Sequence, residues 1–87
     1  MVTPQQIQQW IQAGLACDHI QVAGDGQHFE AVIVSPEFGG KLPLARHQLV
    51  YQALGERMHA EIHALSMKTL TPEEWAAGVA KGQNRHG

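Results

Sequence analysis

The sequence predicts a small α+β domain, in which a three-stranded mixed sheet has its helices packed on one face. Two helix starts of the same kind, Thr-Pro-Gln-Gln and Thr-Pro-Glu-Glu, stand near the beginning and the end of the chain. Between them, two β-rich segments flank a Gly-Asp-Gly turn, and a helical segment then leads into a third strand. Because a strand–helix–strand crossover is right-handed, the third strand should be parallel to its partner. The predicted order is α-β-β-α-β-α.

The first helix is predicted to begin at Thr3, which caps it, and to end between Gly14 and Cys17. Pro4 suits the first helical position, and Gln6 completes a capping box with Thr3. Apolar side chains recur on one face at helical spacing, which indicates that this helix covers a core: Ile7, Trp10, Ile11 and Leu15.

A β-hairpin follows, with strands at His19–Ala23 and Phe29–Ser35 joined by Gly24, Asp25 and Gly26. Glycine adopts positive φ at low cost, so the Gly-Asp-Gly segment favours a tight turn. His28 is expected at the hairpin tip, before the second strand. The next segment, 35–43, contains two prolines and a Gly-Gly pair, which is typical of a loop or a distorted turn.

The second half of the chain should form one helix over 44–58, a mostly covered strand over 62–70, and a short final helix. In the first of these, one face is predicted to consist of His47, Val50, Tyr51, Leu54 and Met58. The final helix starts with a Thr71 cap and fades at Gly78. The sequence thus predicts a single domain over 1–80 and a polar, mobile tail over 81–87.

Composition limits the classes of function. The chain has 87 residues, a formal net charge of −2 and six histidines, so it carries no general basic field that would attract nucleic acid or anionic membranes. Cys17 is the only cysteine, which excludes an internal disulfide and suits a reducing cytosol. The sequence shows neither an apolar run of membrane-spanning length nor a leader pattern, so we expect a soluble, cytoplasmic protein.

His63, in the strand after the long helix, is the strongest candidate functional residue, and His28 is the second. A lone histidine in a strand is more often a hydrogen-bonded structural residue than a ligand. Two imidazoles suit iron or zinc, but a closed site needs about four ligands. Any metal would therefore be shared with a partner or a small thiol. No arrangement of nucleophile and base stands out, so an enzyme is not expected.

The turn at 38–41 offers a second candidate site. Its backbone amides, with the cations of Lys41 and Arg46, would suit a phosphate at the start of the next helix. Gly39 and Gly40 are also explained by a turn that needs glycine for its geometry, and this simpler reading is the favoured one.

Four motifs in order make the chain resemble the BolA family. They are Phe38-Gly39-Gly40-Lys41, Arg46-His47-Gln48-Leu49-Val50-Tyr51, Ile62-His63-Ala64-Leu65 and Lys68-Thr69-Leu70-Thr71-Pro72-Glu73-Glu74-Trp75. The resemblance extends from about Pro4 to Trp75, and the short form of the chain is most similar to the bacterial IbaG-like branch.

The resemblance implies an αββααβα arrangement close to the class II KH fold and a non-enzymatic role as a partner of monothiol glutaredoxins. In such a pair a 2Fe-2S cluster is held by a glutaredoxin cysteine, a glutathione sulfur and two ligands from the BolA-like chain. His63 matches the first ligand position and His28 the second. The implied role is iron–sulfur cluster trafficking or iron and redox regulation. The isolated chain is then expected to be cluster-free, as a monomer or a weak homodimer.

The alternative that the KH-like resemblance implies is a DNA-binding transcriptional regulator that responds to stress such as acid. Its candidate nucleic-acid-binding residues are Lys41, Gly39, Gly40 and Arg46. The sequence supports it less well, because Glu37 offsets the local positive charge and phosphate contacts by lysine and arginine supply most of such affinity.

Overall fold

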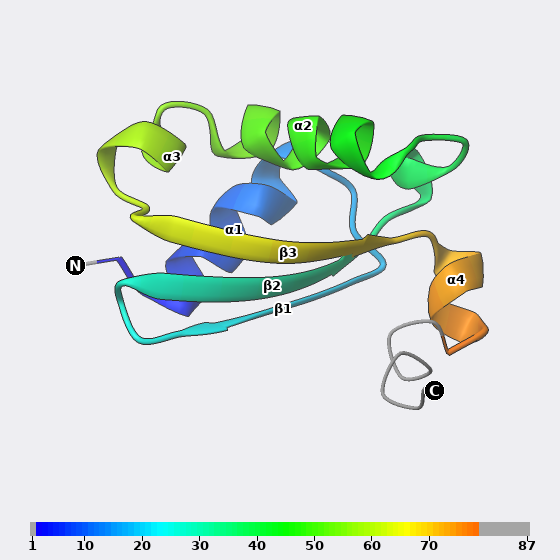
Figure 1. Ribbon diagram of the computed structural model, residues 1–87, viewed down its shortest axis with the longest axis horizontal. Helices are drawn as coiled ribbons and strands as arrows, with labels where there is room; N and C mark the ends of the chain where they lie inside the picture. Colours follow the sequence, from blue (N-terminus) through cyan, green and yellow to red (C-terminus); the bar gives the residue numbers. More distant parts are fainter. Residues whose placement is uncertain (1, 79–87) are drawn as a thin grey trace.

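The computed structural model describes residues 2–78 and has a three-stranded sheet at its centre. β1 (His19–Gly24) pairs antiparallel with β2 (His28–Val34), and β2 pairs parallel with β3 (Ala64–Leu70). The strand order is β1-β2-β3 (Figure 1). These strands confirm the predicted three-stranded mixed sheet. The last two positions of the predicted domain, 79–80, and the predicted tail lie outside the described residues.

Helices α1 (Pro4–Gly14) and α2 (Pro43–Leu54) lie on the same side of this sheet (Figure 1). Thr3 caps α1 with both bonds of the predicted capping box. The largest side chains of the core between these helices and the sheet are completely or almost completely buried: Ile7, Ile11, Phe29, Ile33, Phe38, Val50 and Leu54. Within residues 2–78 no helix combines the length and the apolar composition that a membrane crossing requires.

The predicted single helix over 44–58 is interrupted, and that part of the prediction was wrong. α2 ends at Leu54, and a second short helix, α3 (Arg57–Ala60), follows. Gly55 has a φ of 59° and its amide donates a hydrogen bond to the Tyr51 carbonyl, which is a helix-ending conformation that glycine adopts readily. The observed order, with two helices between β2 and β3, is the αββααβα arrangement.

A short 3-10 turn, η1 (Pro36–Phe38), occupies part of the predicted loop between β2 and α2. Ser35 caps it and is fully buried: its hydroxyl accepts a hydrogen bond from the Glu37 amide and donates one to the Ala16 carbonyl. Glu37 in turn accepts a hydrogen bond from the Ala16 amide, at 3.0 Å. This segment is therefore tied to the end of α1 rather than free.

The last described helix, α4 (Pro72–Ala76), lies beyond the end of β3 rather than in the helical layer (Figure 1). Thr71 and Glu74 make both bonds of the second capping box. Trp75 stacks on His19 of β1, with ring centres 4.8 Å apart and planes 17° from parallel. No residue of α4 is fully buried, so its position depends on these few contacts.

Arg46 of α2 provides the strongest of the contacts that hold α4. Its guanidinium donates to both carboxylate oxygens of Glu74, at 2.8 and 3.2 Å, and to the carbonyls of Lys41 and Thr69. The side chain of Arg46 is only 12% exposed, whereas that of Glu74 is 37% exposed. One planar group thus joins the loop before α2, the end of β3 and α4.

Gly24 permits a close approach of β1 to β2, so Gly24→Ala should destabilise the protein. A methyl group there would lie 2.6 Å from Phe29 Cδ1 and 2.9 Å from Phe29 Cα, and closer still to the His28 carbonyl oxygen. We expect a loss of about 1–3 kcal/mol in the free energy of unfolding, measured with urea. Gln27→Ala, in the same turn, should change it by less than about 0.5 kcal/mol. Equal stability of the two variants would contradict the close approach.

The ion pair of Glu74 should make stability depend on acid pH. The hydrogen bond from Arg46, with a smaller contribution from the Thr71 amide, holds the pKa of Glu74 below its ordinary value of 4.5. A lowered pKa in the folded state gives stabilisation that is complete above the ordinary pKa and is lost as the pH falls through the lowered one.

Glu74→Gln should therefore show a shallower fall in melting temperature below about pH 4.5 than the wild type, in thermal unfolding followed by circular dichroism. At neutral pH the same variant should lose no more than about 1 kcal/mol. The matched control is Glu73→Gln at the exposed neighbouring position, which should keep the wild-type pH dependence. A Glu74→Gln curve parallel to the wild type would rule out this linkage.

Candidate functional site

The structure brings His28 and His63 together at one end of the sheet. His28 is the first residue of β2 and is paired with Ala64, the first residue of β3, so His63 lies directly beside it. The two ring centres are 6.3 Å apart, with the planes at 89°. β3 begins two residues later than the predicted strand, and His63 is exposed rather than covered. Both imidazoles are therefore accessible to a partner.

The turn before His28 is shaped by Asp25, a residue whose role the sequence reasoning missed. One oxygen of its carboxylate accepts hydrogen bonds from the amides of Gln27 and His28, each at 2.9 Å. These bonds lower the pKa of Asp25, and the bond from the His28 amide has the larger effect. Gly26 has a φ of 98°, as the turn requires. The Gly-Asp-Gly segment carried this signal, because aspartate side chains commonly bond to amides two and three residues on.

His63 also borders a hollow of about 340 Å³. The walls come from the end of α2, from α3 and from the segment before β3: Tyr51, Gly55, Met58, His59, Ile62 and His63. Ile62 is buried and fixes the backbone next to His63. Gly55, at which α2 ends, is one of the lining residues, so the interrupted helix contributes to the surroundings of the histidine.

The histidine pair can supply part of a metal site. Among residues 2–78, no three His, Cys, Asp or Glu side chains lie close enough to hold one metal ion. Two imidazoles bound to one tetrahedral ion at about 2.0–2.1 Å have ring centres about 5 Å apart, which is closer than the 6.3 Å observed here, so the side chains would have to reorient to bind one ion. The donor set fits two of four ligand positions, and the others must come from outside this part of the chain.

Cys17 does not complete this set. It precedes β1, whose first residue pairs with the last residue of β2, so it belongs to the opposite end of the sheet from His28. Its thiol donates to the Leu15 carbonyl at 3.3 Å, and burial raises its pKa. The raised pKa favours the neutral thiol, which is a poor metal ligand.

The second candidate site, at Gly39, Gly40, Lys41 and Arg46, also lies at the far end. β2 and β3 have seven residues each, or about 23 Å of strand, and they separate it from the histidines. Lys41 is exposed and Gly40 has a φ of 74°. The amides of Gly39 and Lys41 donate to the Pro36 and Phe38 carbonyls. Four hydrogen bonds of the Arg46 guanidinium are also internal, which leaves Lys41 as the accessible cation of the four candidates.

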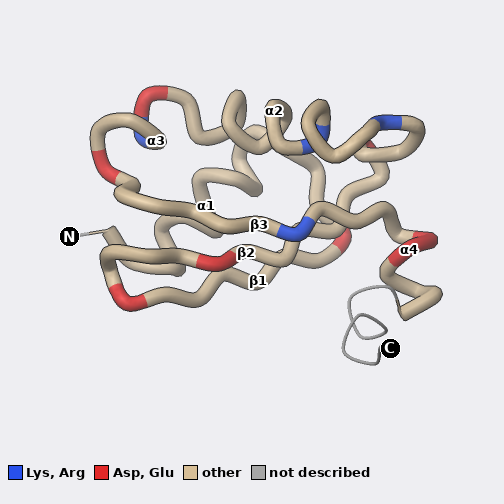
Figure 2. The backbone as a smooth tube through the Cα atoms, viewed as in Figure 1, with Lys and Arg blue, Asp and Glu red and all other residues tan. Residues whose placement is uncertain are grey.

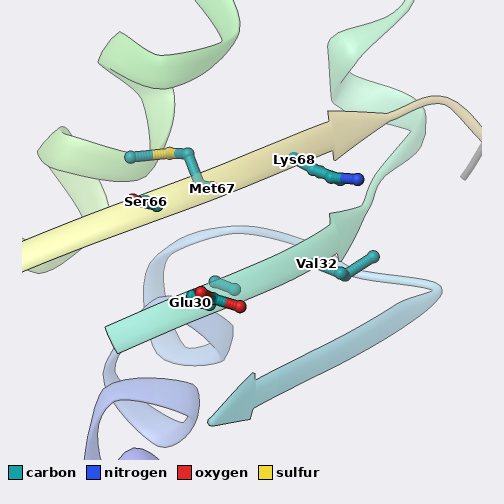
Figure 3. Close-up of a pocket in the computed structure, with 6 residues that line it drawn as sticks. Glu30, Val32, Ser66, Met67 and Lys68 are labelled. Carbon is teal, nitrogen blue, oxygen red and sulfur yellow. The ribbon is translucent and has the colours of Figure 1, made fainter. Parts of the chain in front are cut away.

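A depression of about 270 Å³ on the sheet itself contains none of these candidates. Its walls are Glu30, Ala31 and Val32 of β2 with Ser66, Met67 and Lys68 of β3. Figure 3 shows the labelled side chains of the two strands beside one another. The depression combines one carboxylate and one ammonium group with no imidazole or thiol, so its chemistry does not suit the transition-metal site considered above.

Comparison with known proteins identifies the family. The family described as BolA-like protein matches residues 11–74. BolA-like protein 1 of Mus musculus is 42% identical over 57 residues, which are 66% of this chain and 42% of that protein. A Haemophilus influenzae protein named DNA-binding transcriptional regulator BolA is 44% identical over 59 residues, 68% of this chain and 57% of its own length. The matches thus span about half of these two relatives.

A solved structure agrees with this match. The bolA protein homologue from Coxiella burnetii is 51% identical and superimposes with a TM-score of 0.77, over 87% of this chain and 99% of that one. The family match over residues 11–74 includes the paired strands and the segment that carries His63. We conclude that the chain belongs to the BolA-like protein family.

Proposed function

We propose that this BolA-like chain acts as a non-enzymatic partner of a monothiol glutaredoxin, and that the two proteins hold a 2Fe-2S cluster between them. His63 and His28 would be this chain's ligands, while the glutaredoxin cysteine and glutathione would supply the two sulfurs. The observation that supports the proposal most directly is the exposed histidine pair, with ring centres 6.3 Å apart. Within residues 2–78 this pair has no third donor nearby, which suits a shared site better than a closed one.

The ligand set explains why a histidine-bearing partner would be useful. Neutral imidazoles in place of two thiolates make a cluster less negative and raise its reduction potential. Such a cluster is more readily reduced or released, which suits iron–sulfur trafficking or iron and redox regulation. The chain's own part is to position the two rings: β2–β3 pairing sets their spacing, and Asp25 holds the turn before His28. The proposal places this function in the cytoplasm, where thiols stay reduced.

The test is to titrate the chain into a cluster-loaded monothiol glutaredoxin with glutathione and to record visible absorption and circular dichroism. A new spectrum should saturate at one chain per glutaredoxin subunit. His63→Ala should remove most of it and His28→Ala should weaken it, because each removes one ligand. Gln27→Ala is the matched control, since Gln27 is exposed in the turn before His28 but is not a proposed ligand. An unchanged spectrum with His63→Ala would refute the ligand assignment.

A second candidate function is nucleic-acid binding, as a KH-like DNA-binding transcriptional regulator with a role in stress such as acid. It is favoured by the name of the Haemophilus influenzae relative, which describes that protein as a DNA-binding transcriptional regulator. In this chain the candidate contact is Lys41, which is exposed beside Gly40. Because Arg46 is committed to internal hydrogen bonds, the site offers little positive charge.

Duplex DNA binding should be measured by fluorescence anisotropy at several salt concentrations. If Lys41 contacts a phosphate, Lys41→Ala should weaken binding and reduce the slope of log K against log salt by about 1. The matched control is Lys68→Ala, at an exposed lysine on the sheet. It should leave the affinity and the salt slope unchanged. Equal salt slopes for the wild type and Lys41→Ala would argue against this role.

A further inference from the structure

Glu74 binds Arg46 in the way that a phosphate group would. Its two carboxylate oxygens accept hydrogen bonds from two nitrogens of the guanidinium, at 2.8 and 3.2 Å. Arginine makes the same two-pronged contact with carboxylates and with phosphates, because both present two oxygens to its planar group. The carboxylate of α4 therefore occupies the donors through which Arg46 would hold a phosphate.

The same guanidinium lies against the turn that carries Lys41. Arg46 Nε donates to the Lys41 carbonyl at 2.8 Å, and Lys41 itself is exposed. The carboxylate of Glu37 is held elsewhere, because it accepts a hydrogen bond from the Ala16 amide at the end of α1. Figure 2 shows the positive positions of α2 and of the loop before it at the same end of the molecule as the carboxylates of α4. Without the Glu74 carboxylate, two cations would serve one turn.

Few contacts hold α4 in place. None of its residues is fully buried, and the hydrophobic core cluster includes no residue of this helix. Besides the ion pair, α4 depends on the stack of Trp75 on His19, with ring centres 4.8 Å apart. Displacement of α4 would therefore leave the core between α1, α2 and the sheet intact.

Titration does not release α4 at neutral pH. The hydrogen bond from Arg46 holds the pKa of Glu74 below its ordinary value of 4.5, so the carboxylate stays charged near pH 7. An anion that uses Arg46 must therefore compete with Glu74 for the guanidinium. A phosphate gains in this competition from the second cation, Lys41, which the carboxylate of Glu74 does not contact by a hydrogen bond.

We propose that α4 is an autoinhibitory element over a phosphate-binding site formed by Lys41 and Arg46, in which the Glu74 carboxylate takes the place of the phosphate. The inference rests on the second candidate function, nucleic-acid binding at this turn, and adds how that binding is regulated. With α4 in place, Lys41 is the accessible cation; with α4 displaced, the guanidinium of Arg46 joins it. The ligand is a phosphate group, from a nucleic-acid backbone or from a small phosphorylated molecule.

The experiment compares Glu74→Ala with Glu73→Ala, which changes the net charge equally at an exposed position of the same helix. Binding of fluorescent duplex DNA is measured by anisotropy at several salt concentrations. Glu74→Ala should bind at least about threefold more tightly than the wild type at low salt, with a slope of log K against log salt steeper by about 1. Glu73→Ala should keep the wild-type slope. Arg46→Gln added to Glu74→Ala should remove the gain.

Inorganic phosphate is the second probe, and it separates the two sources of the ligand. It should raise the melting temperature of Glu74→Ala more than that of Glu73→Ala, because it binds where the guanidinium is free. This response together with the gain in DNA binding assigns the site to a nucleic-acid backbone. The same response without a gain in DNA binding assigns it to a small phosphorylated molecule.

The fold of each variant is checked by circular dichroism. If Glu74→Ala does not fold, Glu74→Gln and Glu73→Gln replace the pair, because glutamine also suits the capping box while it removes the charge. Equal DNA affinities, salt slopes and phosphate responses in the two variants would overturn the inference. Nucleic-acid binding would then still stand if Lys41→Ala reduces the salt slope of the wild type. If no variant binds DNA and phosphate acts equally on all, the inference and the second candidate function fail together.

Discussion

The parallel pairing of β2 with β3 is the constraint on which the rest of the structure depends. His28 and His63 are 35 positions apart in the sequence, and only the register that pairs His28 with Ala64 brings them together. A parallel pair needs a crossover, and α2 with α3 provides it on the face where Val50 and Leu54 close the core over Phe29. The parallel pairing of β2 with β3 therefore determines the sheet, the closure of the core and the proximity of the two histidines.

At the other end of the sheet, Arg46 has a corresponding role. α4 has no buried residue of its own, so its place is set by the guanidinium and by the stack of Trp75 on His19. A lysine could not make these four hydrogen bonds from one plane. This internal bonding competes with the phosphate contact that the sequence suggested for Arg46, because both would use the same donors.

Local signals in the sequence were sufficient to predict the kind and the order of most elements. They were not sufficient to predict features that depend on contacts between distant parts of the chain. The two capping boxes and the apolar rows predicted α1 and the start of α4. Apolar spacing placed Tyr51 on the core face and continued the helix through Gly55, because periodicity does not register a positive φ or a helix end. The proximity of His28 to His63 came from family resemblance, since strand register is set by packing across the whole domain.

The place of His28 in the sheet has a consequence for the turn that precedes it. His28 is the first residue of β2, so its position is fixed by the hydrogen-bonded ladder and not by the length of the turn before it. Residues added or removed at the turn would change how far the chain projects beyond the sheet, but not the strand residue that faces β3. The length of the hairpin tip can thus vary while the spacing of the two imidazoles is preserved.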